Sequence, residues 1–167
     1  MMLSLVVTSM TARYLGKEGY GIINYGLSFI NIFTIICKLG IDSIIVNEFV
    51  KNKVKTGEIL GTTLVLRLLS SLCSLILTFI FVSVLKPNQS IVIMVTMIQS
   101  ISLIFVTFDT VDFYFQSILK SKYTAIARSI SYPLVCVLRI IFIFLKASVV
   151  WFAWATVLDA AIIGIVL

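Results

Sequence analysis

Long apolar runs separated by short polar breaks constrain this chain more than any other feature of its sequence. Hydrophobic residues make up 60% of its 167 residues, and the mean hydropathy is +1.17. Soluble domains use only about 45–50% apolar residues. The breaks mark off six runs, 1–12, 20–46, 59–85, 90–115, 123–145 and 149–167. Since about 20 apolar residues form a helix that spans a bilayer, the sequence predicts a single all-α, polytopic transmembrane helix bundle.

The first and last runs differ from the other four. As a helix, residues 1–12 would reach only about 18 Å, against roughly 30 Å of hydrocarbon. The last run stops at Leu167 with no polar residue behind it. We therefore expect about five full spans plus a truncated first helix, in a chain that is cut at both ends.

Lysine and arginine residues in the connections predict the orientation of the bundle, because short cytoplasmic loops hold an excess of them. The connections after the second and fourth runs hold Lys51, Lys53, Lys55, Lys120 and Lys122. Those after the first, third and fifth runs hold Arg13, Lys17, Lys86 and Lys146. The margin is small, but the cluster KNKVK favours a cytoplasmic location for the even-numbered connections.

The second run carries one line of polar side chains. On an unbroken helix, its members fall within about 40° of one another: Asn24, Ser28, Asn31, Ile35, Lys38 and Asp42. Lipid cannot satisfy two amides, an ammonium and a carboxylate. This face is therefore expected to meet other helices or a water-filled cavity, and such a cavity indicates that something crosses the membrane.

The third run repeats this pattern with Thr63, Arg67, Ser70, Ser71, Ser74 and Thr78. Arg67 lies about eight residues into the run, which corresponds to a depth of roughly 12 Å. One interpretation is that Arg67 snorkels to the cytoplasmic headgroups while the hydroxyl groups join neighbouring helices. The other is that Arg67 faces a cavity.

Two arginines share one face of the fifth run. Arg128 and Arg139 are eleven residues apart, which is about 20° in angle and 16 Å in rise, with Tyr132 between them. Planar guanidinium groups bind phosphate bidentately, so this face suits an anionic cargo that moves along the bilayer normal. The alternative is that each arginine anchors the helix at one membrane interface.

Four more charged residues are assigned either a structural or an ion-coupling role: Lys38, Asp42, Asp109 and Asp112. Asp112 is expected to pair with Arg128 across the short connection between the fourth and fifth runs. Lys38 and Asp42 are four residues apart and are expected to neutralise each other. Gly40 lies between them, however, and a helix that ends there would place Asp42 in a turn.

The composition argues against several classes of function. The chain has no His, and its cysteines, Cys37, Cys73 and Cys136, form no CxxC motif, so we expect them to be buried without a disulfide or metal site. A nucleophile elbow, a phosphate-binding Gly-rich loop and an HExxH motif are all missing, which argues against an enzyme or a bound cofactor. The net charge of +6 builds no basic arm, so nucleic acid is not an expected partner.

Two segments carry a family pattern. Residues 12–51 read ARYLGKEGYGIINYGLSFINIFTIICKLGIDSIIVNEFVK, and residues 112–130 read DFYFQSILKSKYTAIARSI. The positions that match are Arg13, Leu15, Gly16, Tyr20, Gly21, Ser28, Phe33, Leu39 and Gly40, while Asn47 stands where the family often has Arg. These segments resemble helices one to two and the link between helices four and five of polysaccharide or oligosaccharide flippases. Those flippases belong to the multidrug/oligosaccharidyl-lipid/polysaccharide exporter superfamily.

The resemblance implies a transporter with two lobes around a central cavity, of which this chain would supply part of the N-terminal lobe. Such proteins move a polyprenyl-pyrophosphate-linked oligosaccharide across the cell membrane by alternating access. Their first two helices help to line the cavity, which favours Asn24, Ser28 and Asn31 as contacts for sugar or headgroup. The implied partners are this lipid-linked cargo, the lipid bilayer and the missing C-terminal lobe.

Three alternatives remain open at the level of the sequence. An exporter of cationic drugs coupled to Na⁺ or H⁺ shares the superfamily, but it would want carboxylates in its cavity, and 13 basic residues outnumber 7 acidic ones. A membrane-embedded polymerase or ligase would need a long outer loop that the runs leave no room for. The third alternative is an inactive gene fragment.

Overall fold

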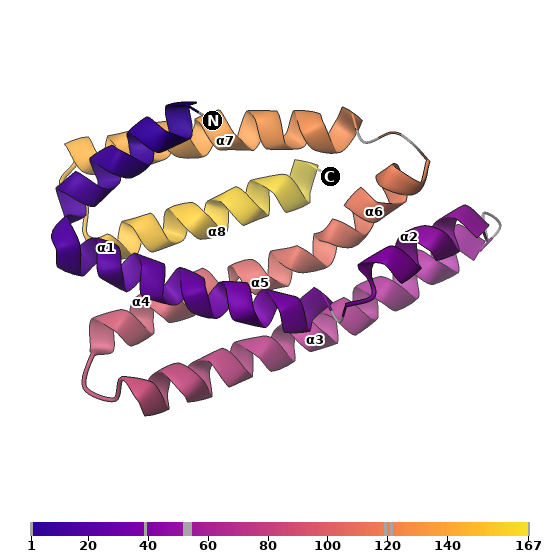
Figure 1. Ribbon diagram of the computed structural model, residues 1–167, viewed down its shortest axis with the longest axis horizontal. Coiled ribbons are helices and arrows are strands. Elements are labelled where there is room, and N and C mark those ends of the chain that lie inside the picture. The colour runs from indigo at the N-terminus through magenta and orange to yellow at the C-terminus, as the bar shows by residue number, and fades with distance from the viewer. Residues whose placement is uncertain (1, 39, 52–54, 119, 121, 167) are drawn as a thin grey trace.

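The protein is a bundle of helices that run along one common direction (Figure 1). The computed structural model describes residues 2–38, 40–51, 55–118, 120 and 122–166, and this part of the chain contains helices and turns but no strand. The helices are α1 (Met2–Lys38), α2 (Asp42–Lys51), α3 (Thr56–Leu85), α4 (Ser90–Ser100), α5 (Ser102–Phe105), η2 (Val106–Phe108), α6 (Asp109–Ser117), α7 (Lys122–Phe144) and α8 (Val149–Val166).

Five helical segments of the described chain are long and apolar enough to cross a membrane. They are Val6–Lys51, Thr56–Leu85, Ser90–Ser117, Thr124–Phe144 and Val149–Val166. The predicted all-α transmembrane bundle is confirmed, and the chain is a multi-pass membrane protein.

Helix α1 contains both the first predicted run and most of the second. The helix bends at Gly16, whose φ of 67° and ψ of −175° depart from helical values, so that two arms diverge from this point (Figure 1). A side chain would be strained at this positive φ, which explains why glycine occupies the bend. The predicted break is therefore one residue wide, and residues 17–38 form the second arm.

The second predicted run, 20–46, does not continue as one helix. Helix α1 ends at Lys38, Gly40 has a φ of 64°, and Asp42 is the first residue of the short helix α2. The predicted run 90–115 is likewise divided into α4, α5, η2 and α6. Between α4 and α5, Ile101 keeps right-handed helical angles, with φ −57° and ψ −29°. The four helical pieces therefore form one continuous segment that crosses the bundle.

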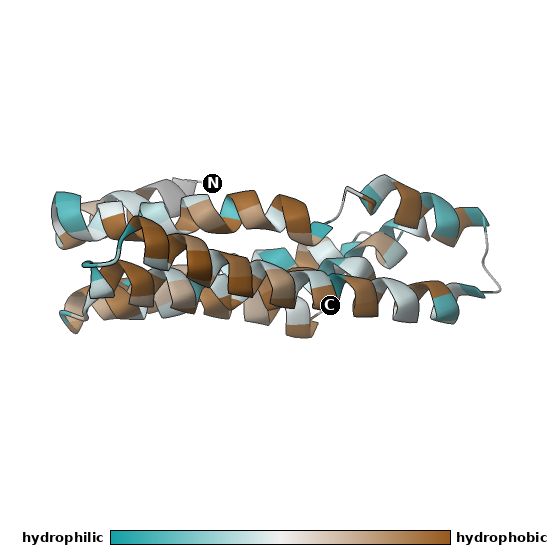
Figure 2. Ribbon diagram, turned by 90° about the horizontal axis from the view of Figure 1, so that it is seen from below, coloured by the Kyte–Doolittle hydropathy of each residue, from teal (hydrophilic) through white to brown (hydrophobic). Residues whose placement is uncertain are grey.

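The connections between helices alternate between the two ends of the bundle (Figure 1). The bend of α1 and the turns after α3 and α7 lie at one end, and α2 and the turn after α6 lie at the other. Figure 2 shows hydrophobic residues along the helices and hydrophilic residues mainly toward these ends. This arrangement agrees with the predicted alternation, while the assignment of one end to the cytoplasm stays a prediction.

Helix α3 shows how polarity is distributed in this fold. Its buried positions are Thr63, Arg67, Ser71, Ser74, Thr78 and Val82. Its exposed positions include Val65, Leu66, Leu68, Leu69, Leu72, Ile76, Phe79, Ile80 and Phe81. The helix thus hides hydroxyl groups and displays apolar side chains, which is the arrangement that suits contact with lipid.

The prediction for the cysteines is partly wrong. Cys37 and Cys136 are buried and free, as expected, but Cys73 is exposed on the apolar surface of α3. The reason is the same distribution of polarity, because an apolar side chain in a membrane-spanning helix is stable against lipid and does not need the interior.

Candidate functional site

The polar line of the second run lies on an open face of α1. Asn24, Ser28 and Asn31 are exposed, whereas Gly26 and Phe33, on the opposite side of the helix, are buried. Asn24 Nδ2 donates to the Tyr20 carbonyl at 2.9 Å, and Ser28 Oγ donates to the Asn24 carbonyl at 2.9 Å. Both bonds stay within α1, so they do not attach this face to a neighbouring helix. We call this row of Asn24, Ser28 and Asn31 the α1 stripe.

Close packing against α4 fixes which side of α1 is turned outward. Gln99 of α4 is fully buried, and its Nε2 donates to the Ile23 carbonyl at 3.5 Å. A Cβ atom at Gly26 would lie only 2.0 Å from Gln99 Oε1. Only glycine allows the Gln99 side chain to reach the backbone of α1 here, and this contact directs the α1 stripe away from α4.

A group of ion pairs lies beyond the α1 stripe, toward the end of the bundle that holds α2, and the exposed Ile35 separates it from Asn31. Lys38 Nζ lies 3.3 Å from Asp109 Oδ2, Arg67 pairs with Asp42, and Arg128 Nη2 lies 3.4 Å from Asp112 Oδ2. We call these six residues the charged cluster: Lys38, Asp42, Arg67, Asp109, Asp112 and Arg128. The cluster joins side chains from α1, α2, α3, α6 and α7.

The expected pair between Lys38 and Asp42 is wrong. Because the chain turns at Gly40, Asp42 begins a new helix and reaches Arg67 on α3, while Lys38 turns to Asp109 on α6. The alternative noted from the sequence, that Gly40 ends the helix, is the one that the structure shows.

Arg67 lies in the interior of the bundle. Its side chain is 1% exposed, it pairs with Asp42, and its guanidinium carbon is 5.0 Å from the centroid of the Phe113 ring. Snorkelling to the headgroups is therefore wrong for this residue, because a snorkelling side chain keeps its charged group exposed. Its Nε and Nη1 atoms have no hydrogen-bond partner among the described residues. In this geometry Arg67 connects α3 to α2 and α6.

Arg128 remains accessible although it is paired. The expected pair with Asp112 is confirmed, and Asp112 also accepts a hydrogen bond of 2.6 Å from Thr124 Oγ1. The side chain of Arg128 is 54% exposed, whereas that of Asp112 is 9% exposed. Asp112 is thus the fixed partner, and the guanidinium group has open directions left for another anion.

Asp109 lies between the two accessible cations of the charged cluster. It pairs with Lys38, whose side chain is 35% exposed, and with Arg128 it lines a cleft of about 240 Å³. Phe105, Phe108 and Gly164 contribute apolar walls to this cleft. Lys38 of α1 and Arg128 of α7 are therefore both close to one carboxylate, that of Asp109.

Arg139 lies farther along α7, away from the charged cluster. It is half-buried and lines a small cleft of about 50 Å³ together with Thr8, Tyr132 and Asp159. Asp159 accepts a hydrogen bond from Ser131, so this carboxylate of the last run has a partner on α7. The structure separates Arg128 and Arg139 into two clefts on one helix.

Several contributors to this site were missed at the level of the sequence. Five polar residues of the fourth run are buried: Thr96, Gln99, Ser100, Thr107 and Thr110. Helical periodicity gave no sign that Gln99 meets Gly26 or that Phe113 covers Arg67, since both contacts join separate helices. Within the described residues, no group of His, Cys, Asp or Glu has the size and arrangement of a metal site.

The fold and the site define a class: a multi-pass α-helical membrane protein with buried ion pairs and a row of exposed polar side chains on one helix. A protein family described as "Polysaccharide biosynthesis protein" matches the chain over residues 1–167. The chain therefore belongs to this family, which is that of the polysaccharide flippases in the multidrug/oligosaccharidyl-lipid/polysaccharide exporter superfamily. Neither a curated protein nor a solved structure matches it.

Proposed function

We propose that the chain is part of a flippase that moves a polyprenyl-pyrophosphate-linked oligosaccharide from the cytoplasmic to the outer leaflet of the cell membrane. The observation that carries the proposal is the exposed α1 stripe, which lies on the same helix face as the accessible Lys38, two turns farther along. Lys38 pairs with Asp109, and Asp109 lines a cleft together with the exposed Arg128. An exposed row of amides and a hydroxyl, followed by two accessible cations, suits a hydrophilic anionic cargo.

The physical difficulty in moving such a cargo is its charge. A diphosphate and its sugars cannot enter hydrocarbon without a large loss of hydration. Ammonium and guanidinium groups replace part of that hydration by charge-assisted hydrogen bonds. The amides and hydroxyl of Asn24, Ser28 and Asn31 offer neutral hydrogen bonds to sugar hydroxyl groups along the rest of the path.

The ion pairs of the charged cluster give the entry step a mechanism. Asp109 and Asp112 neutralise Lys38 and Arg128 while no cargo is bound, and the diphosphate then competes with both carboxylates for the two cations. Rocking of this lobe against a second lobe would expose the bound headgroup to the other side of the membrane. The proposal assigns no chemical reaction and no cofactor to the chain.

The test is delivery of the lipid-linked glycan to the outer leaflet. The double variant Lys38→Gln/Arg128→Gln is expected to lower the rate of surface-glycan appearance at least about tenfold, because two charge-assisted contacts are lost. Lys55→Gln is the matched control, since Lys55 belongs to an exposed pair with Glu58 outside the charged cluster. Each variant is compared at equal amounts of membrane-inserted protein. Unchanged surface glycan in the double variant would refute the proposal.

Arg139→Ala tests how far the path extends along α7. We expect a smaller loss of delivery than for the double variant, because Arg139 is half-buried in a narrow cleft. Normal delivery would remove Arg139 from the path and leave Arg128 in it. If cells that produce the unaltered protein become resistant to cationic drugs and their surface glycan does not change, the drug-exporter alternative would be favoured instead.

A further inference from the structure

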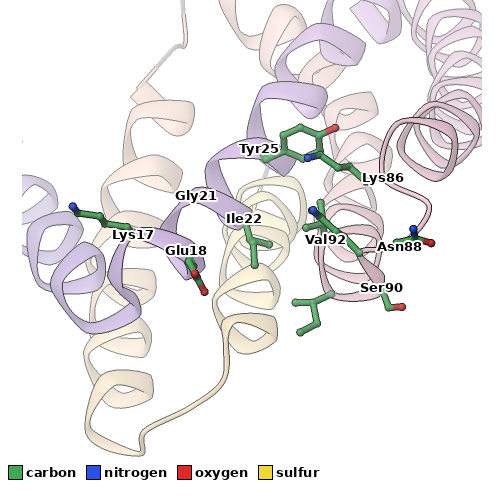
Figure 3. A pocket seen from close by; sticks show the side chains of 11 residues that line it. Lys17, Glu18, Gly21, Ile22, Tyr25, Lys86, Asn88, Ser90 and Val92 are labelled. Atoms are coloured by element: carbon green, nitrogen blue, oxygen red, sulfur yellow. The ribbon is translucent and has the colours of Figure 1, made fainter.

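A third, larger cleft lies at the end of the bundle opposite the charged cluster. It has a volume of about 670 Å³ and lies between the start of the second arm of α1 and the turn from α3 to α4. The lining residues used below come from both sides: Glu18, Ile22 and Tyr25 from α1, and Lys86, Asn88 and Gln89 from the turn (Figure 3).

The cleft is at the level of a membrane interface. Lys17, at its rim, precedes Lys38 by 21 residues of helix, which is about 31 Å at 1.5 Å per residue and close to the hydrocarbon thickness. Lys86 directly follows the 30-residue helix α3. Phospholipid headgroups occupy this level on either side of a membrane, so the assignment does not depend on the orientation of the bundle.

Besides Lys17 at its rim, the cleft is lined by one cation, Lys86, and one anion, Glu18, that do not neutralise each other. Lys86 Nζ is 5.9 Å from the centroid of the Tyr25 ring, and neither Lys86 nor Glu18 forms an ion pair within the described chain. Glu18 precedes Tyr25 by seven residues, so the two charges lie about 10 Å apart along α1. In Figure 3 the ammonium of Lys17 points away from Tyr25 and Lys86.

The rest of the cleft is suited to the beginning of a lipid tail. Ile22 and the first turn of α4, with Ile91 and Val92, form its apolar part. Ile91 is 60% exposed, and the next exposed apolar residue on α4 is Met94. A hydrocarbon chain leaving the cleft can therefore follow the outer surface of α4 without crossing a polar group.

We propose that this cleft binds the phosphoethanolamine headgroup of a bilayer phospholipid. The phosphate accepts hydrogen bonds from Lys86 and from the amides of Asn88 and Gln89, and the ammonium donates to the Glu18 carboxylate. A purely anionic headgroup leaves Glu18 unpaired and is repelled by it, so charge complementarity favours the zwitterion. This site is separate from the α1 stripe and does not depend on the transport function.

Native mass spectrometry of the intact protein, taken from mixed vesicles of phosphatidylethanolamine and phosphatidylglycerol, tests the assignment. The unaltered protein is expected to retain phosphatidylethanolamine about tenfold better than phosphatidylglycerol, which corresponds to one good charged contact. Glu18→Gln is expected to abolish this preference while phosphatidylglycerol stays bound. Lys86→Gln is expected to weaken the binding of both lipids.

The matched control is Lys146→Gln, because Lys146 lies in the turn after α7 at the same end of the bundle and does not line the cleft. It is expected to leave both lipids bound. If Lys146→Gln and Lys86→Gln weakened lipid binding equally, general surface charge would explain the binding, and the proposed site would be overturned. Preferential retention of phosphatidylglycerol, or a preference unchanged by Glu18→Gln, would overturn the headgroup assignment.

Discussion

Helix α3 and the second arm of α1 carry the same polar pattern and use it in opposite ways. Both have polar side chains three or four residues apart within an apolar run. On α3 these side chains are buried and the apolar surface faces outward. On α1 they are exposed, and the opposite apolar side is buried around Ile30, Phe33, Cys37 and Leu103.

A polar stripe in a membrane protein therefore has two separate uses. Hydroxyl groups of α3 donate to backbone carbonyls within the bundle: Thr78 Oγ1 donates to the Ser74 carbonyl at 2.7 Å, and Ser70 Oγ donates to the Ile36 carbonyl of α1 at 3.1 Å. The α1 stripe has no such role between helices. It costs free energy to keep amides against lipid, so an exposed amide face is expected to meet water, a polar cargo or helices outside this chain.

The contrast between the two helices predicts that water reaches the α1 stripe but not the exposed apolar face of α3. In reconstituted protein, a charged maleimide is expected to label Asn31→Cys about a hundredfold faster than the native Cys73, although both side chains are exposed on the bundle. Lipid surrounds Cys73, and bringing a charged reagent or a thiolate into hydrocarbon costs about 3 kcal/mol.

Ile76→Cys, on the same exposed side of α3, is the control for this measurement and should also react slowly. Equal labelling rates at positions 31 and 76 would mean that the two helices face the same surroundings, and the distinction between them would be lost.

Within the charged cluster, the pair of Asp42 with the buried Arg67 is expected to stabilise the folded protein. Asp42→Ala leaves the Arg67 guanidinium buried without its carboxylate, and we expect the free energy of unfolding to fall by about 2 kcal/mol, less than for a fully buried pair because Asp42 is partly exposed. Denaturation in mixed micelles measures this loss.

The double variant Asp42→Ala/Arg67→Met removes both charges and should recover most of that stability. If Asp42→Ala alone has no effect, the ion pair does not hold α2 onto α3, and the burial of Arg67 on the polar face of α3 would need another explanation.

The contact between Gly26 and Gln99 is expected to keep the α1 stripe on the outside of the bundle. Gly26→Ala is expected to destabilise the protein by about 1–2 kcal/mol, because the added methyl group meets Gln99 in a packed interior. Gly21→Ala is the matched control: nothing lies within 4 Å of its added Cβ, and alanine in a helix should be neutral or slightly stabilising. Equal effects of the two changes would show that Gln99 moves aside freely, so that it does not set the rotation of α1.

The smallest effect is expected for a single buried hydroxyl group on α3. Thr78→Val keeps the shape of the side chain and removes one hydrogen bond within the helix, for which about 0.6 kcal/mol is typical in membrane proteins. Unfolding in mixed micelles measures it. A loss above about 2 kcal/mol would show that Thr78 belongs to a larger polar network than its one bond indicates.

Much of the fold could be predicted because lipid imposes simple requirements on a chain. The apolar runs located α3, α7 and α8 to within a few residues, and α7 continues through Pro133. The divisions at Gly40 and at Ile101 were harder to place, since each depends on local φ and ψ angles rather than on hydropathy. The sequence predicted a break between the first two runs, but not that a single residue, Gly16, would form it.

The polar helix faces that make up the candidate site could be predicted from the sequence, but most of the ion pairs between them could not. Asp112 and Arg128 are close along the chain, so their contact could be foreseen. The contact of Lys38 with Asp109 joins residues 71 positions apart, and hydropathy contains no information about it. Arg67 could be recognised as costly in the membrane, but its partner depends on the turn that sends α2 back toward α3.

Apolar length, periodicity and short motifs are local properties of a chain, and here they were enough to predict a membrane-spanning helical bundle, its polar helix faces and its family. The tertiary structure was needed to show that the polar face of α3 is buried while that of α1 is exposed. A helix face acquires its surroundings from its neighbours, and the contact of Gln99 with Gly26 sets the rotation of α1 through residues distant in the chain.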